Sequence, residues 1–364
     1  MKSIPKALTL NGTYYSEDAL SHLPAHLQSA GKQDWEQALG SFIRQWIDDK
    51  DTIQVKTSGS TGTPKTIDLK KKSMLTSASM TCSYLGLSEG QTALLCLNTG
   101  YIAGMMMVVR AMTSQLNLIT VPASGSPLMN VSSQRIDFAA MVPAQVYNSF
   151  MNPLTKQKLE SIGTLIIGGA ALSPELEKIL KNLNGNIYAT FGMTETISHI
   201  GLRRLNGPEH SEAYTVLPGI NIESDDRGCL VASVPWEEEK IVSNDLISIE
   251  SPVSFKWLGR ADNVINTGGI KLIPETIEKK IAEFVGHRFF ITGLPDPRLG
   301  EIPVLVMESS IPLSEMQIDK VLNLIKPHLG KAEMIQRIII AAEFSVTGNG
   351  KINRKESLEN ALKV

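Results

Sequence analysis

The sequence predicts an α/β fold, α+β over the whole chain: a large domain with wound, mostly parallel sheets flanked by helices, a small β-rich subdomain, and a small C-terminal α+β domain. Three observations predict it. Strand and helix patterns alternate from about residue 93 to 191, as in a parallel sheet with crossover helices. From about Gly207 the patterns shorten and become typical of antiparallel strands. The last unit has about 100 residues, enough for its own core. We therefore expect a large domain over residues 1–260 and a small one over 261–364.

Composition indicates an ordinary globular protein and argues against some partners. The 364 residues are 42% hydrophobic and 20% charged. A net charge of −2 gives no reason to expect nucleic acid or an anionic membrane as a partner. No apolar run is long enough for membrane insertion, and the first residues lack the apolar segment of a signal peptide. The three cysteines are widely spaced without a C-x-x-C pair, so we expect buried, reduced thiols in a cytoplasmic enzyme of unknown oligomeric state.

The first elements come from residues 35 to 85. Apolar side chains at helical spacing predict a helix over Trp35–Ile47. Alternating patterns predict strands over Thr52–Val55 and Thr66–Leu69. The run Lys70–Lys72 predicts a solvated turn, and Ser73 is the predicted N-cap of a helix that ends near Leu85.

The middle of the chain repeats strand and helix. Predicted helices cover Ala103–Met112, a segment that Pro143 opens, and a segment from Ser173-Pro174 to about Leu183. In wound sheets, ligands bind at the carboxyl ends of the strands, so the segments directly after strands are where a site is expected. The predicted strands of this region are Ala93–Leu97, Asn117–Val121, Phe138–Val142, Thr164–Ile167 and Ile187–Phe191.

The last third is predicted to hold short strands and then the small domain. Its predicted helices are Pro274–Phe284 and Ser314–Ile325. The predicted strands are Cys229–Val234, Leu246–Ile249, Ser254–Trp257, Arg288–Thr292, Pro303–Met307 and Arg337–Ala341.

A glycine-rich loop between two predicted strands is the strongest local signal. Glycine lets backbone N–H groups face an anion, hydroxyls add donors and lysine adds a positive charge, a combination that suits a polyphosphate. It is not a Walker A loop, because Pro64 precedes the lysine and a strand pattern follows it. A flexible Ser/Gly linker would need neither the lysine nor the flanking strands. The loop consists of Thr57, Ser58, Gly59, Ser60, Thr61, Gly62, Thr63, Pro64 and Lys65.

Seven segments in a fixed order resemble the core motifs of the adenylate-forming superfamily, which includes acyl-CoA synthetases, peptide synthetase adenylation domains and firefly luciferase. The resemblance covers residues from about 52 to 355 and implies a two-step reaction, in which a carboxylate first attacks the α-phosphate of ATP and a thiol then attacks the acyl-adenylate. The segments are Thr57–Lys65, Gly168–Ala170, Phe191–Thr196, Asp245, Trp257–Asn263, Gly268–Gly269 and Thr347–Lys351.

The resemblance implies how the nucleotide is held. The Thr57–Lys65 loop should hold the β- and γ-phosphates, and Gly168, Gly169 and Ala170 should line the adenine. Phe191, followed by Gly192 and Met193 of the same ATP/AMP-binding motif, should stack on adenine where the family usually has tyrosine. Asp245 should bind the ribose hydroxyls, although Ser243-Asn244-Asp245 departs from the common Thr-Gly-Asp, and Arg260 should reach ribose or phosphate.

The resemblance also implies the catalytic residues and the cofactors, which are ATP, Mg²⁺ and coenzyme A as co-substrate. Thr194 should contact the α-phosphate and Glu195 should help to hold Mg²⁺. Lys351 should bridge carboxylate and α-phosphate during adenylation. Asp262 matches the hinge of a mobile C-terminal domain, which should present Gly268 and Gly269 on the CoA-binding face in the second step.

Only 56 residues precede the phosphate loop, fewer than the family usually has. This trimmed form, with Leu97–Gly104 and Phe191–Ser198, most resembles the bacterial o-succinylbenzoate–CoA ligases of menaquinone biosynthesis. Tyr101 stands where those enzymes carry histidine and should line the acyl or pantetheine channel. His199 has a ligand role or a structural one.

Three alternatives stay open. The chain could be an acyl-CoA synthetase for another aryl or fatty acid, or a stand-alone adenylation protein that loads a carrier protein. From a different class, it could be a non-catalytic nucleotide-binding relative, against which the retention of Lys65, Glu195 and Lys351 argues.

Overall fold

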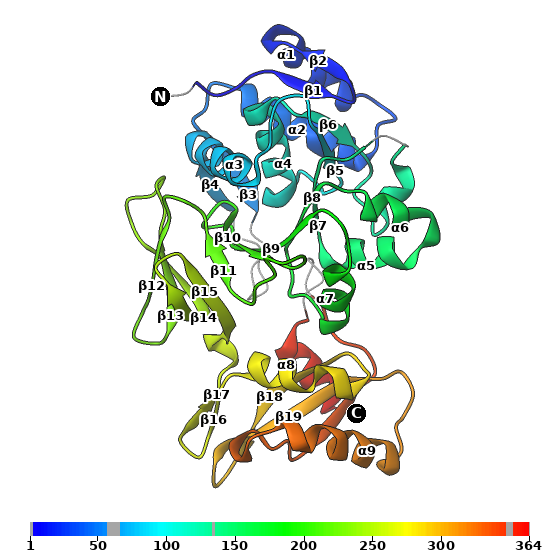
Figure 1. Cartoon of the computed structure of the whole chain (residues 1–364), viewed down its shortest axis with the longest axis vertical. Helices are drawn as coiled ribbons and strands as arrows, with labels where there is room; N and C mark the ends of the chain where they lie inside the picture. Colours follow the sequence, from blue (N-terminus) through cyan, green and yellow to red (C-terminus); the bar gives the residue numbers. More distant parts are fainter. Residues whose placement is uncertain (1–2, 57–65, 133–134, 347–351, 364) are drawn as a thin grey trace.

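A computed structural model describes residues 3–56, 66–132, 135–346 and 352–363 (Figure 1). A large body contains the chain up to about residue 260, and a smaller body contains most of the remaining residues. The mixed α/β class that the sequence predicts is confirmed. In the described part of the chain, no helix is both long and apolar enough to cross a membrane.

Parallel strands form the centre of the large body. Among the described residues, six strands pair in parallel, and their connections run through helices, as the alternating pattern predicts. The strands, in sheet order, are β9 (Asn186–Gly192), β8 (Thr164–Ile167), β7 (Phe138–Met141), β5 (Thr92–Leu95), β6 (Asn117–Thr120) and β1 (Leu8–Leu10), with β2 (Thr13–Tyr15) antiparallel at the end. The later connecting elements are α4 (Ile102–Ser114), η1 (Pro127–Asn130), α5 (Pro143–Met151), α6 (Pro153–Glu160) and α7 (Pro174–Lys181).

Antiparallel strands continue the same hydrogen-bonded sheet on its other side. They begin at His199 rather than near Gly207, because the turn after β9 is too short for a crossover and the chain must return antiparallel to β9. In sheet order they are β10 (His199–Arg204), β11 (Tyr214–Val216), β15 (Ser254–Arg260), β14 (Ile241–Ser251), β13 (Cys229–Ser233) and β12 (Asn221–Ser224).

Helices α1 (Glu17–Leu27), α2 (Asp34–Ile47) and α3 (Lys71–Leu85) complete the large body together with the hairpin of β3 (Thr52–Lys56) and β4 (Thr66–Lys70). The predicted helix over 35–47 is confirmed, and its apolar face is buried. The methionines of α4 are buried packing residues, and Cys82, Cys96 and Cys229 are buried free thiols, as predicted.

The smaller body has its own sheet and its own core. Its described elements are β16 (Ile265–Thr267), β17 (Ile270–Leu272), α8 (Pro274–Val285), β18 (Phe289–Asp296), β19 (Gly300–Glu308), α9 (Glu315–Ile325), β20 (Ile338–Ala341) and α10 (Arg354–Ala361), with short helical turns η2 (Ala261–Asn263), η3 (Lys326–His328) and η4 (Lys331–Glu333). The sheet order is β17-β16-β19-β18, and β20 pairs in parallel with β19. A domain boundary between residues 260 and 261 stays a prediction.

Two ion pairs join the bodies through helix α8. Lys178 Nζ of α7 lies 2.7 Å from Glu283 Oε1, and Lys279 pairs with Glu212. All four side chains are substantially exposed to solvent.

The prediction of a solvated turn at Lys70–Lys72 is wrong for its central residue, and Ser73 is not a cap. Helix α3 begins at Lys71, so Ser73 lies inside the helix and is buried. Lys71 is 2% exposed, and its Nζ donates to the backbone oxygen of Asp48 at 2.8 Å and to its Oδ1 at 2.7 Å. Because Lys71 begins helix α3, its side chain points inward, while Lys70 and Lys72 on either side are exposed. A buried ammonium needs such partners, and Lys71 thereby ties α3 to the end of α2.

We predict that Lys71→Met lowers the free energy of unfolding at pH 7 by about 1–2 kcal/mol, a value reduced because Asp48 is partly exposed. Burial alone would raise the pKa of Asp48, but the hydrogen bond from Lys71 holds this pKa below its ordinary 3.8. The carboxylate therefore stabilises the fold above that pH, and the stabilisation is lost as the pH falls. Urea unfolding at several pH values measures this, and the difference between variant and wild type should shrink below about pH 4.

The exposed neighbour Lys72 provides the matched control, because Lys72→Met removes the same charge from the same helix turn. It should change stability by less than about 0.5 kcal/mol. Equal effects of the two substitutions would contradict the buried pair.

Candidate active site

Two of the predicted segments, Thr57–Lys65 and Thr347–Lys351, lie outside the described residues. Their flanks are described, and in each case the chain ends are paired. Lys56 pairs with Thr66 in the antiparallel β3–β4 hairpin, which confirms that strands flank the predicted phosphate loop. Val346 forms an antiparallel bridge with Ile352. Each segment therefore leaves and re-enters the described structure at one place.

Several predicted site residues lie at the carboxyl ends of parallel strands. Gly168–Ala170 follow β8 directly, and Gly192 ends the neighbouring strand β9. Tyr101 lies beyond β5 at the N-cap of α4 and is 48% exposed. Because the carboxyl ends of parallel strands meet at one edge of a sheet, these residues share that edge, which is where ligands of such folds bind.

The turn between β9 and β10 holds Thr194 and Glu195 in a fixed frame. The buried hydroxyl of Thr196 accepts from Met193 N at 2.9 Å and lies 2.7 Å from the backbone oxygen of Ser198. Ile197 N donates to the carbonyl of Thr194 at 2.9 Å. In this turn Thr194 is half-buried and the Glu195 carboxylate is exposed.

Ile197 gives this turn a strained backbone. Its φ is +67°, in the left-handed region, and its side chain is buried. A β-branched residue rarely adopts this conformation, which costs about 1–3 kcal/mol and persists only where the surroundings impose it. The strain lies two residues from Glu195, in the segment that the resemblance assigns to the α-phosphate and Mg²⁺.

Phe191 belongs to an aromatic cluster that joins the parallel and antiparallel parts of the sheet. Its ring lies edge-on to Phe255 at a centroid distance of 5.0 Å and to Tyr214 at 5.6 Å. Tyr214 and Phe255 stack on each other at 5.6 Å. The Phe191 ring is thus fixed but half-buried. Stacking on adenine stays a prediction.

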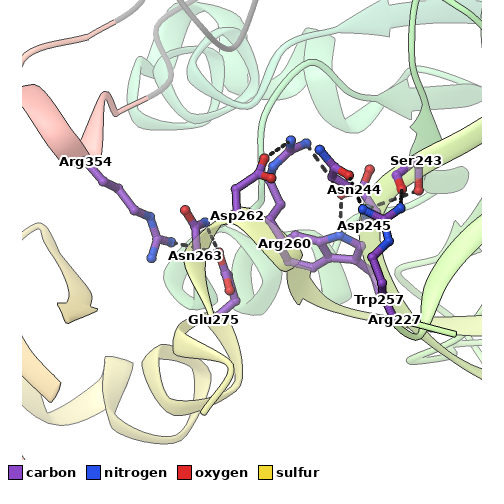
Figure 2. A network of polar contacts seen from close by, with 10 residues as sticks. All are labelled: Arg227, Ser243, Asn244, Asp245, Trp257, Arg260, Asp262, Asn263, Glu275 and Arg354. Atoms are coloured by element: carbon purple, nitrogen blue, oxygen red, sulfur yellow. Dashed lines mark hydrogen bonds and ion pairs between the residues drawn. The ribbon is translucent and has the colours of Figure 1, made fainter. Parts of the chain in front are cut away.

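Asp245 and Arg260 lie side by side on adjacent strands β14 and β15 (Figure 2). Asp245 Oδ1 accepts from Trp257 Nε1 at 2.9 Å and lies 3.9 Å from Arg260 Nη1. Arg260 Nη2 donates to Asp262 Oδ2 at 2.6 Å. Burial alone would lower the pKa of Arg260, but the Asp262 hydrogen bond and the Asp245 charge raise it. The structure therefore brings three predicted residues together: the half-buried carboxylate of Asp245, the cation of Arg260 and the predicted hinge residue Asp262.

The unusual Ser243-Asn244 context is held by Arg227. Its Nη1 donates to Asn244 Oδ1 at 3.0 Å and its Nη2 to the backbone oxygen of Ser243 at 3.1 Å (Figure 2). Ser243 Oγ in turn accepts from Asp245 N at 3.1 Å. The departure from Thr-Gly-Asp thus leaves Asp245 anchored by its neighbours.

Gly268 and Gly269 do not lie beside Asp245 and Arg260. They form the exposed turn of the β16–β17 hairpin in the smaller body. No hydrogen bond or ion pair among the described residues joins that turn to the strand ends of the large body.

A buried polar cluster lies directly behind the Gly192–Ser198 turn. Arg110 of α4 is 2% exposed, and its Nη2 donates to Ser198 Oγ at 2.6 Å. His199 is buried beside it, with Nε2 3.1 Å from Thr81 Oγ1 and Nδ1 3.4 Å from Ser198 Oγ. Burial and the charge of Arg110 hold the pKa of His199 well below its ordinary value, so this imidazole is neutral.

Arg110 has no acidic partner among the described residues. Burial lowers its pKa to about 10, which still leaves a cation at neutral pH. Its Nε is buried and has no hydrogen bond within the described part of the chain, and Met107 Sδ at 3.8 Å is a weak acceptor for Nη1. A buried, uncompensated guanidinium is costly, and it is the group that an anionic ligand would satisfy.

Arg110 is not among the predicted site residues. One signal was present, because it is the one charged side chain in an otherwise apolar helix over 102–112. Two other arginines, Arg203 and Arg204, lie after the Phe191 motif and have protein partners. Arg203 pairs with Glu177, and Arg204 Nη1 donates to Asn186 Oδ1 at 2.7 Å.

The described residues hold no group of three potential metal-ligating side chains. Mg²⁺ takes one or two protein carboxylates and completes its coordination with water and substrate phosphates. The exposed Glu195 carboxylate, at the edge where the strand ends meet, is suited to that single contact.

The chain is similar to proteins of one family throughout most of its length. The sequence profile of the family described as AMP-binding enzyme matches residues 13–232. A 2-succinylbenzoate–CoA ligase of Lactococcus lactis is 21% identical, over 87% of this chain and 72% of that protein.

The chain is also similar to solved structures. An acyl-CoA synthetase (AMP-forming)/AMP-acid ligase II-like protein of Dyadobacter fermentans is 35% identical, with a TM-score of 0.62 over 92% of this chain and 97% of that one. The o-succinylbenzoate CoA synthetase of Bacillus subtilis, solved with an acyl-adenylate intermediate, shares the fold at 14% identity, with a TM-score of 0.76 over 97% and 95%.

We predict that Gly192→Ala lowers the free energy of unfolding by about 2 kcal/mol, because a Cβ there would lie 2.3 Å from Ser198 O and 2.5 Å from His199 Cα, both backbone atoms. Urea unfolding measures the loss. Gly125→Ala is the control, since its Cβ would meet only the Asn148 side chain at 3.3 Å. If the two variants unfold alike, β9 and β10 do not approach this closely.

Proposed function

We propose that this chain, which belongs to the AMP-binding enzyme family, is an ATP-dependent acid–thiol ligase that converts o-succinylbenzoate to o-succinylbenzoyl-CoA, a reaction of menaquinone biosynthesis. Family membership and the ordered motifs support the reaction class. The observation that supports this substrate is buried Arg110, which has no acidic partner among the described residues.

In the first step a carboxylate oxygen attacks the α-phosphorus of ATP, and the bond to the leaving pyrophosphate breaks. Asp245 accepts hydrogen bonds from the ribose hydroxyls, and Arg260 balances charge beside it. Thr194 donates to the α-phosphate from the rigid Gly192–Ser198 turn. Such preorganised donors stabilise the charge that develops in the transition state. Glu195 would hold Mg²⁺ in part, and the bound ion would supply neutralisation of the phosphate charge.

Lys351 completes the first step by bridging the carboxylate and the α-phosphate, two anions that otherwise repel each other. In the second step the thiol sulfur of CoA attacks the acyl carbon, its proton leaves, and AMP departs with the former carboxylate oxygen. In that step Gly268 and Gly269 face CoA, after the smaller body has rotated about Asp262 in the link between the two bodies. Hinges of this kind are a few residues that absorb a change in backbone angles.

The second carboxylate of the substrate gives Arg110 its partner. o-Succinylbenzoate has two carboxylates; one is adenylated and the other stays anionic. Arg110 is the buried cation behind the turn that carries Thr194 and Glu195, and Ser198 and neutral His199 offer further hydrogen bonds to the same anion. A guanidinium binds a carboxylate through two parallel hydrogen bonds. A fatty acid or a simple benzoate would leave this cation unpaired.

The alternatives differ in substrate and acceptor. An aryl or fatty acyl-CoA synthetase would accept monocarboxylic acids, and an adenylation protein that loads a carrier would release acyl-adenylate without using CoA. A non-catalytic relative would bind ATP and release no pyrophosphate. One assay of pyrophosphate release, with mass spectrometry of the product, separates the four.

We predict that Lys351→Ala lowers the rate of pyrophosphate release by at least about 100-fold, because the bridging cation acts in that step. Thioester formation from supplied acyl-adenylate and CoA should stay within about threefold of wild type. The control is Lys355→Ala, a nearby exposed lysine. Pyrophosphate exchange at the wild-type rate in the Lys351 variant would remove the assigned role.

We predict that Arg110→Met raises the KM for o-succinylbenzoate at least about 100-fold, the cost of removing one partner of a buried charge pair. Activity with monocarboxylic acids should not fall, and the free protein should be no less stable than wild type in thermal unfolding, since a buried unpaired charge has been removed. Arg204→Met is the control, because its guanidinium already has protein partners. An unchanged KM in the Arg110 variant would remove the substrate assignment and leave the reaction class.

A further inference from the structure

The Glu275 carboxylate connects the crossover between the two bodies with the C-terminal helix (Figure 2). It belongs to the first turn of α8 and is 8% exposed. Its Oε1 accepts from Asn263 Nδ2 at 2.5 Å and lies 3.3 Å from Arg354 Nη2. Asn263 comes directly after Asp262, and Arg354 is the first residue of α10. One buried oxygen therefore bonds to both segments.

Glu275 also presses against the end of β15. A Cβ at Gly259 would lie 2.3 Å from Glu275 Oε2 and 2.5 Å from Ile273 Cγ2, and the φ of Gly259 is +155°. Only glycine allows this approach. Glu275 Oε2 is buried and has no hydrogen-bond partner among the described residues. Among the described residues, only Asn263 and Arg354 hold this buried carboxylate.

Arg354 fixes the other end of the connection. Its guanidinium forms a fork with Glu278, with Nη1 2.8 Å from Oε1 and Nη2 3.0 Å from Oε2, and Nη1 also donates to the carbonyl of Ile291 at 3.0 Å. Burial raises the pKa of Glu278, and the charge of Arg354 opposes that rise. Planar guanidinium geometry suits this set of acceptors, which an ammonium cannot satisfy together.

Arg354 lies three residues after Lys351. The residues between them that the structure describes, Ile352 and Asn353, are bonded to the chain on the other side of the Thr347–Lys351 segment. Ile352 is bridged to Val346, and Asn353 N donates to Ser345 O at 2.8 Å. Asn353 also caps α10. A displacement of Arg354 therefore moves the chain end from which residue 351 continues.

We propose that Glu275 and Arg354 are positioning residues: together with Asn263 they fix the chain end at residues 352–354, which directly follows Lys351 in the sequence, relative to the link at residues 259–263. This rests on the proposed function for the role of Lys351, but the coupling itself does not. The pair acts through the position of the chain and touches no substrate in this assignment.

The test compares the two half-reactions in the full-length protein. Arg354→Lys keeps the charge and loses the fork, and Asn263→Ala removes the crossover contact while leaving the Arg354–Glu278 fork intact. We expect both to lower the kcat of pyrophosphate release about 10- to 100-fold, the range for residues that orient a catalytic group, with the KM for ATP and thioester formation from supplied acyl-adenylate within about threefold of wild type.

The matched control is Lys280→Gln on the same helix. Lys280 pairs with Glu333 at 2.6 Å and contacts none of the three network residues, so its variant should retain both half-reactions. Equal losses in both half-reactions of Arg354→Lys or Asn263→Ala, with a lower melting temperature, would show a structural role only and overturn the proposal, as would unchanged adenylation.

Hydrogen exchange tests the coupling without any substrate. In Asn263→Ala the backbone amides of residues 353–362 should exchange at least about threefold faster than in wild type, although Asn263 does not touch α10, because the restraint is passed through Glu275. Unchanged exchange overturns the proposal. If wild-type protein releases no pyrophosphate with any acid, the proposed function fails, and the exchange result alone decides the coupling.

Discussion

A buried charge is costly unless it has a partner, and this cost is met in different ways at three places in this molecule. Lys71 is buried and meets two oxygens of Asp48, which fixes α3 on α2. Arg354 is half-buried and lies between Glu275 and Glu278. Arg110 is the exception, because its guanidinium meets only a hydroxyl and a thioether among the described residues. The first two charges have charged partners within the fold, whereas the third has none among the described residues.

The topology of the sheet brings the predicted site residues of the large body to one edge. Parallel strands bring Gly168–Ala170 and Gly192 to one edge, and the short return into β10 converts the parallel sheet to an antiparallel one at that edge. This junction contains the strained Ile197 and the Thr196 bonds, so the segment with Thr194 and Glu195 is rigid. The antiparallel strands then carry Asp245 and Arg260 to the crossover.

Most elements could be predicted from the sequence, because hydrophobic periodicity and caps such as Ser173 are local signals. The inward orientation of Lys71 could not, since it depends on where helix α3 starts and on Asp48, a distant residue. Arg110 was visible as a charge in an apolar helix, but its lack of an acidic partner among the described residues is a fact of the packed structure. The same holds for Glu275, which joins residues 263 and 354 only after folding. Local pattern predicts elements, and contacts distant in sequence decide which charges remain free.

The two ion pairs on α8 have a consequence for the environment in which the protein works. Lys178–Glu283 and Lys279–Glu212 join the bodies through exposed side chains, in contrast to the more deeply buried Glu275 contacts. Salt screens exposed charges over a Debye length of about 8 Å at physiological ionic strength and less at higher salt. Rising ionic strength therefore weakens the two exposed ion pairs more than the buried Glu275 contacts, so the salt concentration of the medium sets which of these contacts between the bodies contribute most.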